Sequence, residues 1–138
     1  MKKDDCIFCK IANGEIPSAT IFEDREFRVI LDISPASKGH ALILTKEHYD
    51  NIFELDAETA GKLFSLASVI ARAMKKVLNC DGMNVLQNNG TIAGQTVFHF
   101  HMHLIPRYEN DGIQMGWEPG SLADEDKESL IAAIKKEI

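Results

Sequence analysis

Three of the chain's five histidines lie in the segment GQTVFHFHMHLIPR, as His99, His101 and His103. Side chains at i, i+2 and i+4 of a β-strand share a face, so these histidines are expected to form a row with about 6.6 Å between neighbours. A strand over residues 97–106 is expected, and its apolar face would consist of Phe98, Phe100, Met102 and Leu104. Because imidazoles titrate near neutral pH, such a row is a candidate for chemistry.

Three interpretations fit this histidine row. It is a half-exposed strand with incidental histidines, a metal centre bound by a His-x-His pair, or a relay in which one imidazole attacks while its neighbours fix its tautomer and contact the substrate. A catalytic metal usually has a carboxylate nearby, and residues 94–107 contain none. Gln95, Thr96 and the glycine-containing turns are instead donors suited to phosphate oxygens. The segment therefore favours the relay.

A second candidate site is the C-x-x-C pair formed by Cys6 and Cys9 in DCIFCKI. This spacing lets two thiolates bind one metal ion, and it also occurs by coincidence in a short turn. A thioredoxin-like redox role is disfavoured because no βαβ pattern follows. A closed metal site needs two more ligands, and His48 in KEH, just after an expected strand, offers one. Cys80, at the end of an expected helix, is interpreted as a small buried residue.

A mixed set of strands and helices must position these groups. Strands are expected at 20–23, 27–32, 39–45, 83–87 and 97–106. An amphipathic helix is expected over 57–78, with Asp56 as its N-cap, and a C-terminal helix is expected in LADEDKESLIAAIKKEI. Strands joined by short turns, with helices between runs of strands, predict one α+β domain over residues 1–138 with an antiparallel sheet.

Composition narrows the class of partner and the compartment. The chain has 15 basic and 21 acidic residues, and its net charge of −6 disfavours nucleic acid or an anionic membrane surface. No apolar run approaches the roughly 20 residues of a membrane-spanning helix, and no apolar signal segment follows MKKDDCIFCK. Three cysteines, an odd number without a secretory context, fit reduced thiols. A cytoplasmic protein is expected.

Several ordered motifs together resemble the histidine-triad (HIT) family, in its Hint-like branch. HFHMHLI matches the triad pattern, and GQTV, LDISP, GHALIL…KEH and CIFCKI with GEIPS match its upstream segments. The resemblance spans roughly Cys6 to Gly120 and implies a HIT-like fold and a homodimer. It implies an enzyme that cleaves purine nucleoside phosphoramidates or dinucleoside polyphosphates at the α-phosphate. IQMGWEPG resembles a segment near the partner's site, which would let Trp117 help select substrates.

The resemblance also implies roles for single residues. His101 would attack the α-phosphate and form a nucleotidyl-histidine that water resolves, while His103 would bind phosphate and support it. Because this third histidine is kept, and is not replaced by glutamine as in a sister group of transferases, hydrolysis is favoured. Gln95 and Thr96, where many members carry serine, would donate to phosphate or leaving-group oxygens. The other implied contacts are His40 and Asn88 near the phosphate, Asp32 at the ribose, and Ile7, Phe8, Ile11 and Ile33 around the base.

By the same resemblance, a structural zinc ion would be bound by Cys6, Cys9, His48 and His99, as in some bacterial-looking members. The ion would hold the N-terminal segment to the sheet and leave the other triad histidines free. Two further classes of function are consistent with the sequence. One is a nucleotide-binding or protein-interaction module with vestigial catalysis, and the other is metal-dependent hydrolysis through the histidine row, which a chelator would stop.

Overall fold

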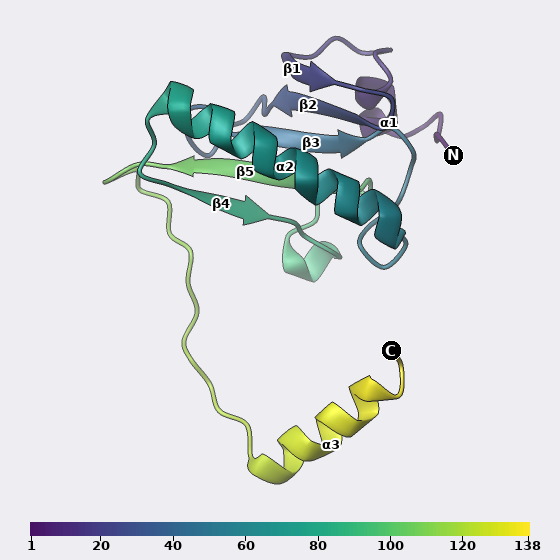
Figure 1. The fold of residues 1–138 in the computed structure, drawn as a ribbon, viewed down its shortest axis with the longest axis vertical. Helices are drawn as coiled ribbons and strands as arrows, with labels where there is room; N and C mark the ends of the chain where they lie inside the picture. The colour runs from purple at the N-terminus through teal and green to yellow at the C-terminus, as the bar shows by residue number, and fades with distance from the viewer.

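The computed structural model describes every residue from Met1 to Ile138. Its body is a five-stranded sheet with the order β1-β2-β3-β5-β4, and every neighbouring pair is antiparallel (Figure 1). The strands are β1 (Thr20–Glu23), β2 (Phe27–Leu31), β3 (Ala41–Thr45), β4 (Gly82–Leu86) and β5 (His101–Arg107). The expected α+β architecture with an antiparallel sheet is therefore confirmed.

The long helix α2 (Ala57–Leu78) covers one face of the sheet and has the bounds expected from its periodicity. Asp56 caps its first turn by accepting a hydrogen bond from the Thr59 amide at 2.8 Å, and Asn79 ends it in the left-handed conformation. The main core forms where this helix meets the sheet. Its helix side chains are Leu63, Ala67, Ile70 and Met74, and its strand side chains include Val29, Ile43, Met102 and Leu104.

A short helix, α1 (Ile7–Ala12), covers the opposite face near its edge. The sequence analysis allowed only for a short turn here, although Cys6 is the N-cap and apolar residues recur at helical spacing. Ala12, with the partly buried Phe8 and Ile11, packs against Ile30, Leu42 and Leu44. Because both faces of the sheet are covered, the incidental half-exposed strand is the wrong description of β5.

Strand β5 places two of the triad histidines beneath α1. His101 is paired with Leu44 and His103 with Leu42, and directly opposed residues share a face of the sheet. Met102 and Leu104 point to the α2 side, as expected. The expected start of the strand at Val97 is wrong, because the Phe100 amide donates to the Tyr49 carbonyl and leaves the ladder.

The residues before β5 therefore depart from the predicted alternation. His99 lies outside the strand yet is completely buried. Phe98 was expected on the buried face, but its exposed fraction is 46%.

The C-terminal helix α3 (Asp124–Lys135) stands apart from the sheet. Residues 112–123, which contain neither helix nor strand, lead from β5 past the edge strand β4 to this helix (Figure 1). Every residue of α3 is exposed. No helix in the chain has the length and apolar character that crossing a membrane requires.

Candidate functional site

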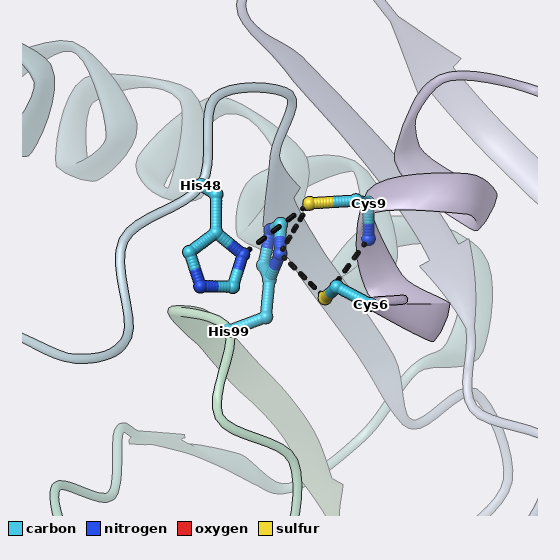
Figure 2. A group of neighbouring side chains, drawn as sticks. All are labelled: Cys6, Cys9, His48 and His99. Atoms are coloured by element: carbon cyan, nitrogen blue, oxygen red, sulfur yellow. Dashed lines mark hydrogen bonds between the residues drawn. The ribbon is translucent and has the colours of Figure 1, made fainter. Parts of the chain in front are cut away.

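Four thiol and imidazole groups from three distant parts of the chain meet beside α1 (Figure 2). The Sγ atom of Cys6 lies 3.4 Å from Nδ1 of His99, and Sγ of Cys9 lies 3.4 Å from the same nitrogen. The Cys9 sulfur is also 3.3 Å from Nδ1 of His48. Sulfur and nitrogen ligands of a tetrahedral zinc ion lie about 3.6 Å apart when computed from ordinary zinc–ligand distances. The four residues expected to bind zinc therefore form a group that fits one tetrahedral ion.

The second nitrogen of each imidazole in this group has a fixed partner. His48 Nε2 lies 2.7 Å from a carboxylate oxygen of Asp50, and His99 Nε2 lies 2.8 Å from the Thr45 carbonyl oxygen. Both partners are acceptors, so each Nε2 carries the proton and each Nδ1 presents a lone pair to the thiols. The sequence analysis missed Asp50 and Thr45. Asp50 follows His48 by two residues, whereas Thr45 acts through its backbone, which no residue type reveals.

Burial sets the charge state of this cluster. It lowers the pKa of His99 to about 4, so the ring is neutral at physiological pH and able to bind a metal ion. Burial raises the pKa of the Cys9 thiol, and the Lys3 amide partly opposes this by donating to the sulfur. A cation among these groups would stabilise the thiolate, which couples metal binding to proton release.

His101 occupies the centre of the histidine row and is almost completely buried. Its Nδ1 lies 2.6 Å from the carbonyl oxygen of His99, so Nδ1 carries the proton and Nε2 carries the free lone pair. The ring of Phe8, from α1, meets it edge-on with ring centroids 4.9 Å apart. Burial lowers the pKa of His101, which keeps the imidazole neutral near pH 7. An oriented neutral imidazole is a competent nucleophile.

A chain of hydrogen bonds fixes the tautomer of His103. The Ala36 amide donates to Nδ1 of His40 at 2.9 Å, so the His40 proton is on Nε2. This Nε2 lies 2.9 Å from Nδ1 of His103 and 3.5 Å from a carboxylate oxygen of Asp32. The His103 proton is therefore on its own Nε2, where it can be donated.

The structure also brings a carboxylate close to the histidine row, which the local sequence lacks. Asp32, His40 and His103 could together offer three metal ligands. Two nitrogen ligands on a tetrahedral zinc ion lie about 3.3 Å apart, whereas these two imidazole nitrogens are 2.9 Å apart. The shorter distance is that of a hydrogen bond, and it favours the relay over a catalytic metal.

Gln95 holds the loop that precedes the row. Its side chain is only 2% exposed, accepts from the Gly90 amide at 2.8 Å, and donates to the carbonyl oxygens of Asp50 and Val97 at 2.6 and 3.1 Å. Both amide protons are thus engaged by the backbone. In this structure Gln95 positions the loop, which differs from the expected donation to phosphate oxygens.

The neighbours of Gln95 remain near the row with their polar groups available. Thr96 is exposed, and Asn88 donates weakly to the Gly94 carbonyl at 3.4 Å. Gly94 has a φ of 95°, and a Cβ atom there would lie 3.2 Å from the Asn88 amide nitrogen. Glycine therefore allows this loop to approach Asn88 closely.

The four apolar residues expected around the base divide into two pairs. Phe8 and Ile11 are partly buried against the sheet, and Phe8 also covers His101. Ile7 is 53% exposed and Ile33 is 98% exposed, so neither belongs to the core. The structure places Ile7 beside Phe8 on α1, whereas Ile33 follows Asp32 in the turn after β2.

Comparison with known proteins gives the same assignment along most of the chain. The family described as HIT domain matches residues 13–110. Protein hit of Bacillus subtilis is 42% identical over 138 residues, which cover 98% of this chain and 95% of the relative. Adenosine 5'-monophosphoramidase HNT1 of Saccharomyces cerevisiae is 45% identical, covering 96% and 80%. Adenylylsulfatase HINT3 of Arabidopsis thaliana is 36% identical, covering 99% and 71%.

Solved structures agree with the fold. A HIT family protein from Bacillus anthracis superposes with a TM-score of 0.92 at 42% identity, covering 98% of both chains. A zinc-bound histidine triad family protein from Mycobacterium smegmatis gives a TM-score of 0.76 at 36% identity, covering 96% of this chain and 94% of that one. With its paired strand histidines, buried cysteine–histidine cluster and α+β sheet, the chain belongs to the HIT family.

Proposed function

We propose that this HIT protein hydrolyses purine nucleoside phosphoramidates through a nucleotidyl-His101 intermediate. The contact that carries the proposal is the 2.6 Å bond from His101 Nδ1 to the His99 carbonyl, because it leaves the Nε2 lone pair for attack. Relatives named as adenosine 5'-monophosphoramidase support an amine leaving group. The relative named adenylylsulfatase supports attack at the same phosphorus with a different leaving group. Dinucleoside polyphosphates are the second substrate class to test.

The proposed reaction has two displacements at the α-phosphorus. His101 Nε2 forms a bond to phosphorus, and the bond to the leaving amine breaks with its electron pair on nitrogen. That nitrogen takes a proton, and His103 Nε2–H is the donor that the His40 contact makes available. Water then displaces His101, releases the nucleoside monophosphate and returns a proton to His103. Both steps use neutral histidines, as burial favours.

The nucleotide is proposed to lie across the α1 side of the sheet. Asp32 would accept from the ribose hydroxyls, and Asn88, Thr96 and His40 would surround the phosphate. The base would contact the apolar side chains of Ile7, Phe8, Ile11 and Ile33. The exposure of Ile7 and Ile33 supports this arrangement, because a planar base would cover apolar surface that the protein leaves accessible.

A structural zinc ion at Cys6, Cys9, His48 and His99 is proposed as part of the same protein. Its fit rests on the ligand distances and on the Asp50 and Thr45 contacts behind the imidazoles. When bound, such an ion supplies folding free energy by tying α1 to the segment before β5. The thiolate ligands need reduced cysteines, which supports a cytoplasmic location.

We also propose that the protein is a homodimer, as the family resemblance implies. The edge strand β4 and the outer face of α2 offer a surface for a second copy, since Val85 is 46% exposed and Phe64 is 60% exposed. Trp117, which is 87% exposed in the segment leading to α3, is proposed to contact substrate at the partner's site.

Single-turnover kinetics with a labelled adenosine phosphoramidate test the proposed reaction. Acid-quenched wild-type protein should carry the adenylyl group on His101. His101→Ala should lose several orders of magnitude in hydrolysis while it retains binding of adenosine monophosphate. Thr96→Ala is the matched control, because loss of a positioning donor should leave a slower reaction.

Three outcomes would contradict the proposal. Substantial activity in His101→Ala, or adenylylation of another residue, would exclude the proposed nucleophile. Tight nucleotide binding without turnover of any tested substrate would favour the module with vestigial catalysis. Loss of turnover on addition of chelator, with folding unchanged, would instead indicate metal-dependent hydrolysis.

A further inference from the structure

Helix α3 carries an apolar face without a partner in its own chain. Leu130, Ile131 and Ile134 lie on one side of the helix, and their exposed fractions are 50%, 52% and 53%. The helix has 12 residues, and an isolated helix of this length is only marginally stable in water. Its stability therefore requires packing of that apolar face against another surface.

A groove of matching chemistry exists on the body of the protein. It lies between the C-terminal half of α2 and the outer strands β1 and β2. Its apolar lining includes Ile21, Leu31, Ile70, Ala73, Val77 and Leu78. Val77 is 82% exposed and Ile21 is 46% exposed, so the groove is accessible in the single chain.

Charge adds a direction to this match. The first turn of α3 carries Asp124, Glu125 and Asp126. The part of α2 beside the groove carries Arg72, Lys75 and Lys76 and has no acidic residue in its last four turns. An acidic helix start and a basic helix face attract each other, and this attraction orders the two elements as they dock.

The path of the chain determines which copy of the groove α3 can fill. Residues 112–123 lead away from β5 past β4, whereas the groove of the same chain lies on the β1 side of the sheet (Figure 1). A second copy placed along the β4 edge would occupy the space into which α3 extends. A segment of 12 residues spans up to about 40 Å when extended, which is enough to cross to such a neighbour.

We infer that α3 docks in the α2–β1–β2 groove of a second copy of this chain, so that two copies exchange their C-terminal helices. Leu130, Ile131 and Ile134 fill the groove, and the first turn of α3 lies against the basic residues of the partner's α2. The exchanged helices add apolar contact to any pairing through β4, and they anchor the segment that carries Trp117.

Disulfide trapping tests the exchange. Ala73→Cys in the groove and Ile134→Cys on α3 are made in separate full-length chains, which are mixed, equilibrated and exposed to oxidised glutathione. The expected product is a cross-linked pair containing one chain of each kind, identified by mass spectrometry of the joined peptides. Ser129→Cys, on the opposite face of α3, is the matched control and should give at least tenfold less cross-linked product with Ala73→Cys.

Two outcomes overturn the inference. A disulfide that forms only within one chain of the Ala73→Cys, Ile134→Cys double variant would show that α3 folds back on its own groove. Absence of a specific cross-link in both experiments would show that the groove does not bind α3.

A second measurement uses charge in place of cysteine. Val77→Glu or Ile134→Glu should weaken self-association by about tenfold or more in sedimentation equilibrium, because each places a carboxylate in an apolar contact. Each should also speed proteolysis within residues 112–123. Unchanged association and unchanged proteolysis would overturn the inference, and neither measurement depends on the hydrolase activity.

Discussion

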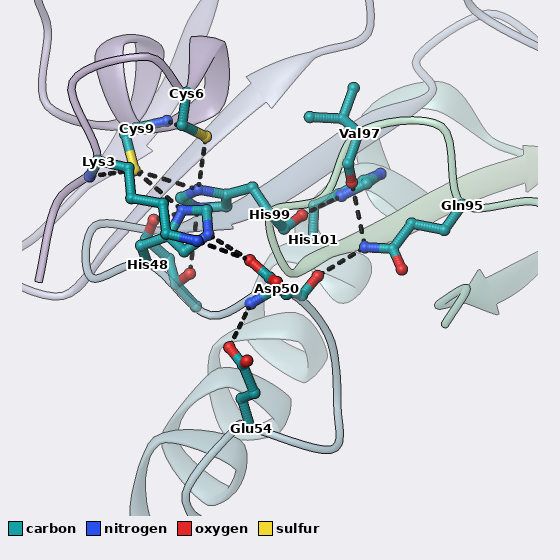
Figure 3. A network of polar contacts seen from close by, with 11 residues as sticks. Lys3, Cys6, Cys9, His48, Asp50, Glu54, Gln95, Val97, His99 and His101 are labelled. Atoms are coloured by element: carbon teal, nitrogen blue, oxygen red, sulfur yellow. Dashed lines mark hydrogen bonds and ion pairs between the residues drawn. The ribbon is translucent and has the colours of Figure 1, made fainter. Parts of the chain in front are cut away.

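Gln95 donates from Nε2 to the carbonyl oxygen of Asp50 at 2.6 Å, and this bond joins the loop before β5 to the metal cluster (Figure 3). The Asp50 carboxylate at the same time accepts from His48 at 2.7 Å and from Lys3 at 3.1 Å. One residue therefore contacts both the loop beside the nucleophile and a candidate zinc ligand. The two sites are neighbours that share their supporting backbone.

Substitution of Gln95 should reveal this supporting role. Gln95→Leu removes three hydrogen bonds and leaves two buried carbonyl oxygens and one buried amide without that partner, so we expect unfolding to become easier by about 2–4 kcal/mol. Urea denaturation without nucleotide measures this change. Thr96→Ala, at an exposed neighbour, is the control and should shift stability by less than about 0.5 kcal/mol. Equal stability of Gln95→Leu and wild type would favour the originally expected contact with phosphate.

Loss of one thiol should remove the metal. Cys9→Ser takes away a ligand that contacts both His48 and His99, so bound zinc should fall from close to one ion per chain to near zero, with a fall in melting temperature. Elemental analysis and thermal denaturation check the two effects together. Cys80→Ala is the control, because Cys80 is buried outside the cluster and should not alter zinc content. Wild-type protein that contains no zinc after chelator-free purification would exclude the metal proposal.

Asp32 should discriminate between ribose and deoxyribose. Asp32→Ala is expected to weaken binding of adenosine monophosphate by about 1.5–3 kcal/mol, the range for hydrogen bonds to a charged group. Titration calorimetry with ribose and deoxyribose ligands checks this, because only the ribose ligand offers both hydroxyls. Equal losses for the two ligands would assign Asp32 instead to support of His40, whose Nε2 lies 3.5 Å from its carboxylate.

Acid should destabilise the fold partly through His103. Burial, with smaller effects from His101 and His40, lowers the pKa of His103 to about 4, whereas an unfolded histidine titrates near 6.5. The unfolded state therefore binds more protons between these pH values, and stability falls as pH falls from about 6.5 toward 4. We expect this residue to contribute about 1–3 kcal/mol of the loss by pH 4.5.

The measurement compares urea denaturation of wild type and His103→Gln at pH 7.5 and pH 4.5. Glutamine does not titrate, so the variant should lose less stability on acidification. The other buried histidines and the metal ligands are present in both proteins, and their effects cancel in the difference. Identical pH dependence of the two proteins would contradict the assigned shift.

The sequence predicted best what depends on local periodicity. The bounds of α2 follow from its apolar spacing and its Asp56 cap, and the alternation of Met102 and Leu104 with His101 and His103 follows from the period of a strand. The start of β5 could not be predicted, because it is set by a backbone bond between Phe100 and Tyr49, two residues far apart in the sequence.

The polar partners were the least visible part of the site. The donors and acceptors that set each imidazole tautomer are largely backbone groups, such as the Ala36 amide and the Thr45 and His99 carbonyls. Every residue type has these groups, so no motif marks them. Gln95 shows the converse case, since its type suggests a phosphate donor but its burial assigns the amide to the loop.

His99 contacts the two sites through different atoms. Its Nδ1 faces the thiols, whereas its carbonyl oxygen accepts from the nucleophile. A backbone carbonyl is supplied by any amino acid, so the orientation of His101 does not depend on the imidazole of its neighbour. Lineages could therefore discard the cysteines and the ion, stabilise the N-terminal segment by other packing, and retain the same reactive nitrogen.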